Sequence, residues 1–448
     1  MQGKISMELW FCQSEDGFSL DELVIKLSEI FEKKAFSELL KLILQLVQEV
    51  LISRIMQRKG FMNCCSEGHL RLNGGFSRRI RTSLGEFEID FWRVRCSECD
   101  KAFVPLQRFV GLGKYQTKTN ELEKLVIETV SETNYRRAVS GLARNGKLSV
   151  PFQTTHGWML RTDCDEIEIS QRVIGKMPVQ IMPDGTKFKG AGENGEARQG
   201  DLKAVIGITM RGEIFPLGTW AGKSWEQINQ EWKQREVKFP DGSILISDGE
   251  VGLADAFADY TDEVQRCHWH LTRDLYHMMH YDGARKADTK PIQDALAGAL
   301  AIELPKEDFE QVSEQEKSDI EKRMEDTESV IDKLITYLDG CGYSVASTYI
   351  QRAKRSMFGY VRRWLKWGII APRASSMIER VMRELARRIK RIAYGWSDKG
   401  VTKIARIILK RFANKEEWEQ YWQKKMNITD SVLLNIGNYK CSSQNLGQ

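Results

Sequence analysis

The sequence predicts a mixed α/β protein in which a sheet is preceded by helices and a strand-rich hairpin and is interrupted by a long helical segment. Between residues 178 and 271, apolar runs of strand length alternate with amphipathic helical runs, as in an α/β sheet. From residue 272 to about 373 the chain is charged and helical in pattern, with no strand signature. A length of 448 residues suits two to four domains.

The composition is that of a soluble globular protein. Apolar residues make up 42% and charged residues 29% of the chain. The sequence contains neither an apolar run of membrane-spanning length nor a signal-peptide pattern at the N-terminus, so we expect a cytoplasmic, nucleoid-associated protein. Nine cysteines, an odd number, favour free thiols and metal ligands over a disulfide framework.

The charge is unevenly distributed, although the net charge is only +5. Residues 351–412 hold eighteen Lys and Arg against three acids, whereas residues 301–333 hold twelve acids against five bases. A basic block of this kind suits a polyanion such as DNA, but it also suits an ordinary exposed helical face.

The first 59 residues predict a helical region. Ser19 and Glu22 form a capping-box pattern, and apolar residues then recur at helical spacing up to Gly60. Because this helix is too apolar to stand alone, it should pack on the body of the protein or dimerise with a second copy.

Residues 60–112 predict a β-hairpin with cysteines at both ends. Two thiolates on a tight turn form half of a zinc site, and a hairpin can bring two half-sites together. Cys64 could replace Cys65, and a hairpin without metal remains the alternative. The candidate zinc ligands are Cys65, His69, Cys96 and Cys99.

Residues 113–170 predict three short helices. A tight turn before a third helix that carries Arg and Thr fits a helix-turn-helix DNA-binding domain. A plain helical connector fits the same pattern.

In the sheet region, Asp184 and Asp248 each follow an apolar strand and precede a glycine that would let the chain turn. Two carboxylates on neighbouring strands repel one another unless a cation lies between them. Mg²⁺ (or Mn²⁺) takes one or two carboxylates together with water and phosphate, so this pair predicts a metal-dependent phosphoryl-transfer site.

A third acid is expected on the basic helix that begins near residue 375. Glu379 and Glu384 are the candidates, and their spacing of five places them on different faces. Either acid could instead be an intrahelical salt-bridge partner. The surrounding arginines could follow DNA phosphates, and they are Arg380, Arg383, Arg387 and Arg388. Trp364, Trp367 and Trp396 could stack on an unpaired base or pack between helices.

The stretch "RCHWHL" holds Cys267 and His270 where a fifth strand should enter a helix. One Cys and one His are only half of a zinc site. On a strand their side chains would face opposite sides, so they could act together only if the chain turns. A structural or DNA-positioning role, a metal or catalytic role, and a buried strand end all remain open.

Together, "PDGTKFK", "ILISDGEVGL", "RCHWHLTRDL" and "SMIERVMRELARR" resemble Mutator-type transposases over roughly residues 175–400. The resemblance implies a ribonuclease-H-like catalytic core with a triad of Asp184, Asp248 and Glu379. It also implies that Cys267-x-x-His270 is a family signature and that about Thr272–Arg373 is a helical insertion. Many relatives carry Asn at the position of Ser376, and that departure bears on the choice of Glu379 over Glu384.

The resemblance implies a DNA transposase of a bacterial insertion sequence that binds double-stranded DNA, both terminal inverted repeats and target. We expect it to act as a homodimer or higher oligomer, with Mg²⁺ (or Mn²⁺) and a candidate structural Zn²⁺. The predicted core spans 171–271, the insertion 272–373, and the helix of the third acid with a basic C-terminal region 374–448. The rivals are a non-catalytic DNA-binding regulator and a ribonuclease-H-type nuclease without strand transfer.

Overall fold

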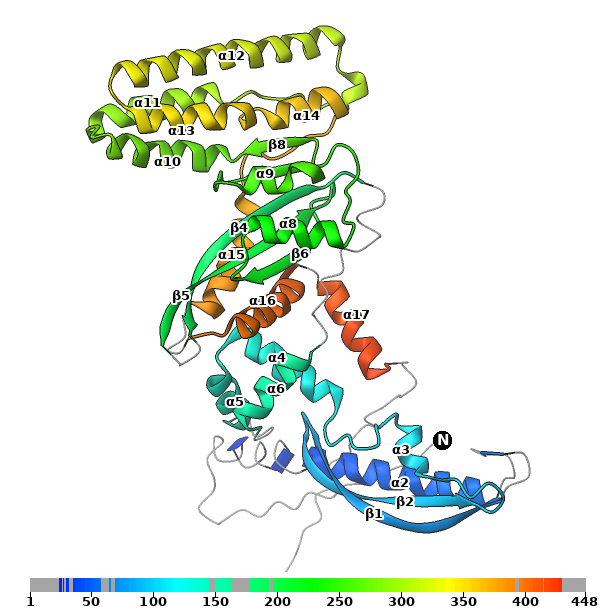
Figure 1. The fold of residues 1–448 in the computed structure, drawn as a ribbon. Helices are drawn as coiled ribbons and strands as arrows, with labels where there is room; N and C mark the ends of the chain where they lie inside the picture. The colour runs from blue at the N-terminus through cyan, green and yellow to red at the C-terminus, as the bar shows by residue number, and fades with distance from the viewer. Residues whose placement is uncertain are drawn as a thin grey trace, which may run out of the picture. The chain divides into compact units, whose positions relative to one another are not determined.

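The computed structural model describes residues 24–25, 27, 30–31, 35–57, 64–65, 69–144, 150–162, 177–192, 196–390, 395–413 and 415–428 (Figure 1). The predicted capping box at Ser19 and Glu22 lies outside these residues. The chain divides into two compact units, which are described separately. The first comprises residues 1–130, 135–156 and 416–448, and the second comprises residues 131–134 and 157–415.

In the first unit, a long helix packs on an antiparallel sheet. Helix α2 (Phe36–Gln57) lies against β1 (Leu70–Thr82) and β2 (Gly85–Cys96), and β3 (Ala102–Phe103) completes the sheet. On β2, every second residue from Gly85 to Phe91 is buried because alternate side chains face the helix. Leu51 of α2 meets Phe87 and Ile89 there, in a core closed by the short helix α3 (Pro105–Phe109).

Three helices follow this sheet, as the sequence predicts, and they are α4 (Asn120–Glu132), α5 (Tyr135–Arg144) and α6 (Phe152–Arg161). Tyr135 of α5 meets His156 of α6 edge to face, with ring centroids 5.3 Å apart. Helix α17 (Lys415–Met426) packs on α4, where the Trp418 indole nitrogen donates to Glu128 at 2.8 Å. Of the described residues in the predicted 374–448 segment, residues 416–428 group with the first unit.

The second unit is built on a five-stranded sheet in the order β6-β5-β4-β7-β8. Strands β4, β5 and β6 are antiparallel, whereas β7 runs parallel to β4 and β8 parallel to β7. The strands are β4 (Gln180–Ala191), β5 (Ala197–Ile208), β6 (Ile214–Ala221), β7 (Ile244–Ser247) and β8 (Glu263–Arg266). The predicted α/β sheet is confirmed, and β4 is its central strand.

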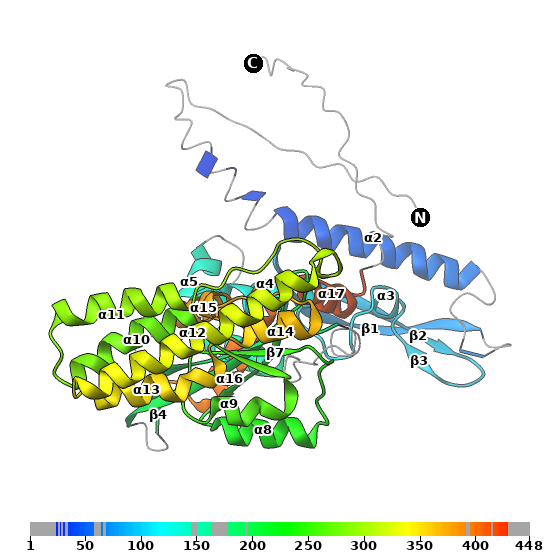
Figure 2. The ribbon, with the colours of Figure 1, turned by 90° about the horizontal axis from the view of Figure 1, so that it is seen from above.

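Helices cover the sheet. Helices α8 (Trp225–Gln234) and α9 (Leu253–Phe257) lie together on one side of it (Figure 2). Ser224 caps α8 in a reciprocal capping box with Gln227. Trp225, Trp232 and Phe257 fill the space between these helices and the sheet. Helix α15 (Ser376–Ile389) packs on β4, and α16 (Asp398–Ala413) packs on β6.

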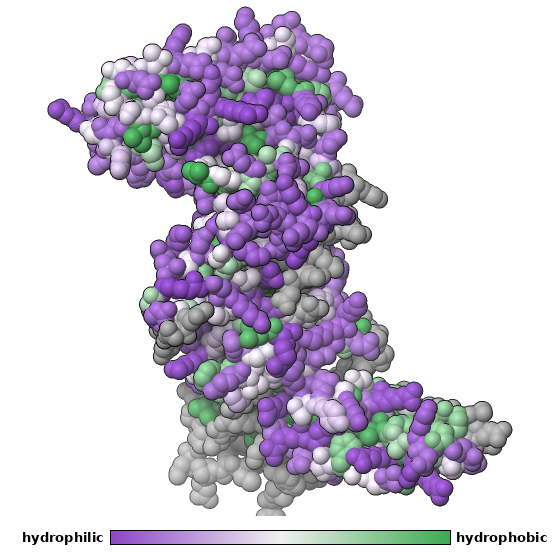
Figure 3. All heavy atoms as spheres, in the orientation of Figure 1, coloured by the Kyte–Doolittle hydropathy of each residue, from purple (hydrophilic) through white to green (hydrophobic). Residues whose placement is uncertain are grey.

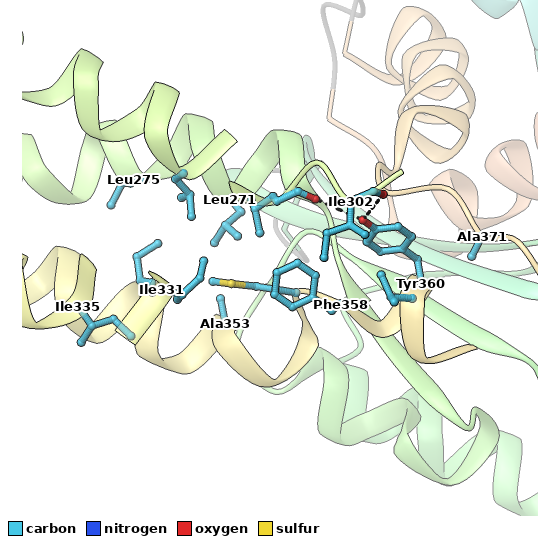
Figure 4. Close-up of a cluster of buried hydrophobic side chains, with 14 of the residues drawn as sticks. Leu271, Leu275, Ile302, Ile331, Ile335, Ala353, Phe358, Tyr360 and Ala371 are labelled. Atoms are coloured by element: carbon cyan, nitrogen blue, oxygen red, sulfur yellow. Dashed lines mark hydrogen bonds between the residues drawn. The ribbon is translucent and has the colours of Figure 1, made fainter. Parts of the chain in front are cut away.

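Between β8 and α15 the chain is helical, as predicted. The helices are α10 (His268–Tyr281), α11 (Lys286–Ala299), α12 (Glu314–Gly340), α13 (Ser344–Ala353) and α14 (Gly359–Trp367). Figure 4 shows the apolar core that they share, in which the Tyr360 hydroxyl donates to the carbonyl oxygen of Ile302 at 2.8 Å.

This helical segment is attached to the sheet at β8. The buried Gln265 side chain donates to the Met357 carbonyl at 3.1 Å and accepts from the Tyr360 backbone nitrogen at 2.9 Å. A Cβ on Gly359 would lie 2.2 Å from the Val264 carbonyl oxygen, so only glycine allows this approach. His268 also binds the Met357 carbonyl, with its Nε2 at 2.7 Å.

Hydrophilic residues cover most of the visible face of α12, whereas hydrophobic residues gather over α2 and the β1–β2 hairpin (Figure 3). Exposed apolar residues of the latter region include Leu42, Met56, Leu72 and Trp92. Among the described helices, none combines the length and the apolar character needed to cross a membrane.

Candidate active site

The first predicted acid, Asp184, lies within the central strand rather than at its end. Strand β4 runs straight through Asp184 and Gly185, whose Cα atoms pair with Ala204 and Lys203 of β5. The expected turn at this Asp-Gly pair is therefore wrong, because the strand continues in register to Ala191. Its position in the middle of the sheet leaves the Asp184 carboxylate half-buried.

The second acid, Asp248, follows β7 directly and does stand at a turn. Gly249 has a φ of +89°, and the backbone nitrogen of Glu250 donates to Asp248 Oδ1 at 3.0 Å. A Cβ at residue 249 would lie 2.0 Å from the guanidinium carbon of Arg266, so the turn needs glycine for space as well as for backbone conformation.

Arg266 itself was not singled out in the sequence. It is buried at the end of β8, beneath the Asp248 turn, and its Nη2 donates to the Tyr349 hydroxyl at 2.8 Å. This buried cation links the Asp248 turn to helix α13.

The third acid, Glu379, lies in the first turn of α15. Its Oε1 accepts from the Ser375 hydroxyl at 3.4 Å and lies 3.9 Å from Nδ1 of His270. Glu384, the alternative, instead forms an ion pair with Arg387 at 2.8 Å. The two glutamates therefore have different surroundings, and only Glu379 contacts the His270 region.

The three acids Asp184, Asp248 and Glu379 act on one another electrostatically. Burial, together with the negative charges of Asp248 and Glu379, raises the pKa of Asp184 to about 6, although the Gly185 amide and His270 act in the opposite direction. Ionisation of the Asp184 carboxyl group beside two other carboxylates is costly. A bound cation would lower that cost. All three groups are oxygen donors, which fits a hard ion such as Mg²⁺.

Cys267 and His270 are brought together because the chain leaves the strand one residue before Cys267. Strand β8 ends at Arg266, and Cys267 is the N-cap of α10, which begins at His268. The two side chains therefore face the same side, with His270 Nδ1 3.2 Å from Cys267 Sγ. The expected continuation of the strand through Cys267 is wrong, and the helix supplies the turn that joint action requires.

Both groups have shifted acidities. Burial opposes ionisation of the Cys267 thiol, but hydrogen bonds from His270 and Ser375 lower its pKa to about 7. Burial opposes protonation of His270, but the Cys267 sulfur and the Asp248 carboxylate raise its pKa. The pair thus favours the charged forms of both partners.

The predicted DNA-binding arginines do not share one face. Arg380, Arg383 and Arg387 are exposed on α15, whereas Arg388 is buried with its guanidinium 4.9 Å from the Trp396 ring centroid. Arg388 therefore packs inside the unit and is not placed to meet phosphate.

The three tryptophans proposed to stack on a base also differ in their exposure to solvent. Trp364 and Trp396 are buried, which leaves them unable to stack on a base, and Trp367 is partly exposed. Trp269, beside His270, was not singled out although it is 51% exposed and carries the Arg273 guanidinium 4.7 Å from its ring centroid.

In the first unit, four cysteines form a compact cluster. The sulfurs of Cys64, Cys65, Cys96 and Cys99 lie within 4.8 Å of one another, with Cys64–Cys99 at 3.0 Å and Cys65–Cys96 at 3.5 Å. The hydrogen bond between Cys64 and Cys99, followed by burial, raises the pKa of Cys64 to about 12, whereas backbone hydrogen bonds from Cys99 and Glu98 lower that of Cys96 to about 6.

The predicted ligand set therefore needs one correction. His69 is exposed and outside the cluster, because its backbone pairs with Ser97 at the base of the hairpin and its ring does not reach the sulfurs. Cys64, which was considered only as a replacement for Cys65, lies in the cluster beside it. The adjacent pair Cys64–Cys65 was the sequence signal for this arrangement.

Comparison with known proteins gives one family. Residues 19–390 match the model of the transposase family called "Transposase, Mutator family". The match covers the hairpin, the helices α4 to α6, the whole sheet and α15. A search among curated proteins found no match.

Proposed function

The chain belongs to the Mutator family of transposases, and on that premise we propose that it cleaves DNA at the ends of a mobile element and joins the freed ends to target DNA. The observation that carries this proposal is that Asp248, just after β7, and Glu379 of α15 lie near enough to Asp184 of β4 for their charges to raise its pKa. These acids lie far apart in the sequence, yet all three are partly buried in the second unit, and carboxylates that shift one another's pKa are typical of functional sites.

We assign the sheet to the ribonuclease-H-like class that the family resemblance implies. The order β6-β5-β4-β7-β8, with three antiparallel strands followed by two parallel ones, supports this assignment. The central strand then carries the first acid and its parallel neighbour the second. The helices from α10 to α14 are the insertion that separates the second acid from the third.

We propose that the three carboxylates hold divalent metal ions, Mg²⁺ or Mn²⁺, against the DNA phosphate. When bound, the ions supply the positive charge that activates water or a 3′-hydroxyl and stabilises the leaving oxygen. The carboxylates fix the position of the positive charge of the metal. Without a bound cation, the three negative carboxylates repel one another. Exposed Arg380, Arg383 and Arg387 would hold the phosphate backbone alongside α15.

The first unit would recognise the element ends. Its helix α5 carries exposed arginines and follows α4, which supports the expected helix-turn-helix role. Two ends must be held for one joining event, so we propose a homodimer or higher oligomer on DNA. The exposed apolar residues of α2 and the hairpin offer a surface for that association.

We also propose that the cysteine cluster binds one structural Zn²⁺. Four sulfurs placed about 2.3 Å from an ion at the corners of a tetrahedron lie roughly 3.8 Å apart. The sulfur pairs at 3.0 and 3.5 Å, with all pairs within 4.8 Å, bracket that spacing. Cys64 and Cys65 follow α2 and Cys96 ends β2, so a metal would tie helix and hairpin together.

The test uses the purified full chain and labelled DNA that carries one end of the element, with Mg²⁺. We expect nicks at the element end and, with added target DNA, joined products. A regulator would bind the end without metal-dependent products. A nuclease would cut without joining, and either result would overturn the proposal.

A further inference from the structure

The N-terminus of α15 is fastened to the N-terminus of α10. The His268 backbone nitrogen donates to the Arg373 carbonyl at 2.9 Å, and the Ser375 backbone nitrogen donates to Cys267 Sγ at 3.3 Å. Cys267 and Ser375 are 0% and 2% exposed, so these contacts are closed to water. The residues are 108 apart in sequence, and the whole helical insertion lies between them. The contacts therefore lie where the chain leaves the sheet and where it returns.

The Ser375 hydroxyl is used in an unusual way. Serine at an N-cap commonly accepts a hydrogen bond from the first turn of its own helix. Ser375 is the N-cap of α15, yet its side chain makes no such bond. Its Oγ lies instead 3.3 Å from His270 Nδ1 and 3.4 Å from Glu379 Oε1. The hydroxyl has one proton, which it donates to the carboxylate while it accepts from the His270 ring.

The remaining directions are fixed by chemistry. The Ser375 backbone nitrogen can only donate, so Cys267 sulfur is the acceptor in that contact. His270 Nδ1 lies between the Cys267 sulfur and the Ser375 hydroxyl, at 3.2 and 3.3 Å, and its N–H can serve both. One continuous chain of contacts thus runs from the end of β8 to the Glu379 carboxylate.

We propose that Cys267, His270 and Ser375 are positioning residues that fix the Glu379 carboxylate in the active site. This inference rests on the proposed function, in which Glu379 is a metal ligand. The contacts from Cys267 and His270 through Ser375 restrain the Glu379 carboxylate, in the way that residues behind a metal ligand orient it.

The cleanest variant is Ser375→Ala, which removes one oxygen and keeps the backbone contact to Cys267. Residues behind metal ligands typically contribute about 10–100-fold to metal affinity or activity. We therefore expect Mn²⁺ to bind the DNA-free full-length chain at least about tenfold more weakly, as measured by electron paramagnetic resonance. The rate of end cleavage should fall by a similar factor, with DNA affinity and melting temperature unchanged.

Matched variants separate positioning from a general effect on folding. Ser375→Thr retains the hydroxyl and should restore Mn²⁺ binding and cleavage, and Ser376→Ala alters the exposed neighbour and should change neither. Cys267→Ser, which keeps an acceptor, should retain more activity than Cys267→Ala. His270→Asn, which keeps a polar group near the place of Nδ1, should likewise exceed His270→Ala.

The outcomes distinguish the two proposals. If Glu379→Gln is inactive while Ser375→Ala and Cys267→Ala bind Mn²⁺ and cleave like the unchanged chain, the positioning role is overturned and the function stands. If Glu379→Gln keeps full activity, the function proposed for Glu379 fails, and the positioning role fails with it. Loss in Ser375→Ala that follows a lowered melting temperature and is not restored by Thr would show a structural role only.

Discussion

Asp184 and Asp248 each lie three residues beyond Ile181 and Leu245, which are paired neighbours on the parallel strands β4 and β7. The two carboxylates therefore stand at the same level of adjacent strands, one within its strand and the other at the turn that follows. The rise in the pKa of Asp184 that burial and the Asp248 charge produce is a direct consequence of that placement.

We expect Asp184→Asn, Asp248→Asn and Glu379→Gln each to abolish metal-dependent cleavage and joining. An amide keeps the shape of the carboxylate but loses the charge that holds the metal, and loss of several kcal/mol of transition-state stabilisation slows a reaction by about a thousandfold or more. Cleavage of a labelled element end with Mg²⁺, beside a gel shift on the same DNA, measures both chemistry and binding. Binding should remain nearly intact.

Glu384→Gln is the control for these variants, since Glu384 lies on the same helix but pairs with Arg387. It should cost little activity. Full activity in Asp248→Asn would contradict the enzyme proposal. Activity kept in Glu379→Gln but lost in Glu384→Gln would move the third ligand to Glu384.

The sequence predicted most of the elements of the sheet and its helices because their signals are local. Apolar runs of strand length predicted β5, β6 and β7. The positions of Asp184 and Cys267 within their elements were predicted wrongly. Whether a strand turns at Asp-Gly or continues depends on its pairing with β5, and β8 ends at Arg266 where α10 begins its cap at Cys267. Such tertiary effects leave no local pattern.

The same limit applies to side chains that lie close in space and far apart in sequence. Ser375 and His270 are in contact although they are 105 residues apart, and no sequence pattern near Ser375 predicts this contact. Arg387 and Arg388 are adjacent in a basic helix, yet one is exposed and the other packs on Trp396. Helical periodicity can separate such neighbours only when the buried side of the helix is known.

Arg383→Ala should weaken DNA binding to a similar extent for any sequence, because an exposed arginine on α15 would contact phosphate rather than bases. Loss of one phosphate contact lowers the slope of log K against log salt concentration by about one. Titrations of element-end and unrelated DNA at several salt concentrations measure this slope. Arg388→Ala is the comparison and should lower stability more than affinity. A loss confined to the element end would contradict a phosphate role for Arg383.

Purified full-length chain should contain one zinc, and Cys99→Ser should lose it, because three sulfurs hold the ion less well than four. His69→Ala should keep its zinc, since His69 lies outside the cluster. Metal analysis after mild dialysis gives the stoichiometry, and thiol counting under denaturing conditions tells zinc-bound thiolates from disulfides. A value near zero with unchanged folding, or two disulfides in the cluster, would remove zinc from the proposal.

His268 should make the stability of the second unit depend on pH between about 6.5 and 4. Burial lowers the pKa of His268 to about 4, and its neutral ring donates from Nε2 to the Met357 carbonyl at 2.7 Å. In the unfolded chain a histidine has its ordinary pKa near 6.5. As the pH falls through this window, the unfolded chain therefore binds a proton that the folded chain does not, and the free energy of unfolding decreases.

The contribution of His268 is complete above about pH 6.5 and is lost by about pH 4, with a slope of at most roughly 1.4 kcal/mol per pH unit. His268→Gln retains a donor for the Met357 carbonyl but cannot be protonated, so its stability should vary less across the window than that of the unchanged chain. Thermal unfolding at half-unit pH steps measures the difference. His280→Gln, which replaces an exposed histidine of the same helix, is the control. Parallel pH profiles for the unchanged chain and His268→Gln would show that the Met357 contact does not depend on a neutral ring.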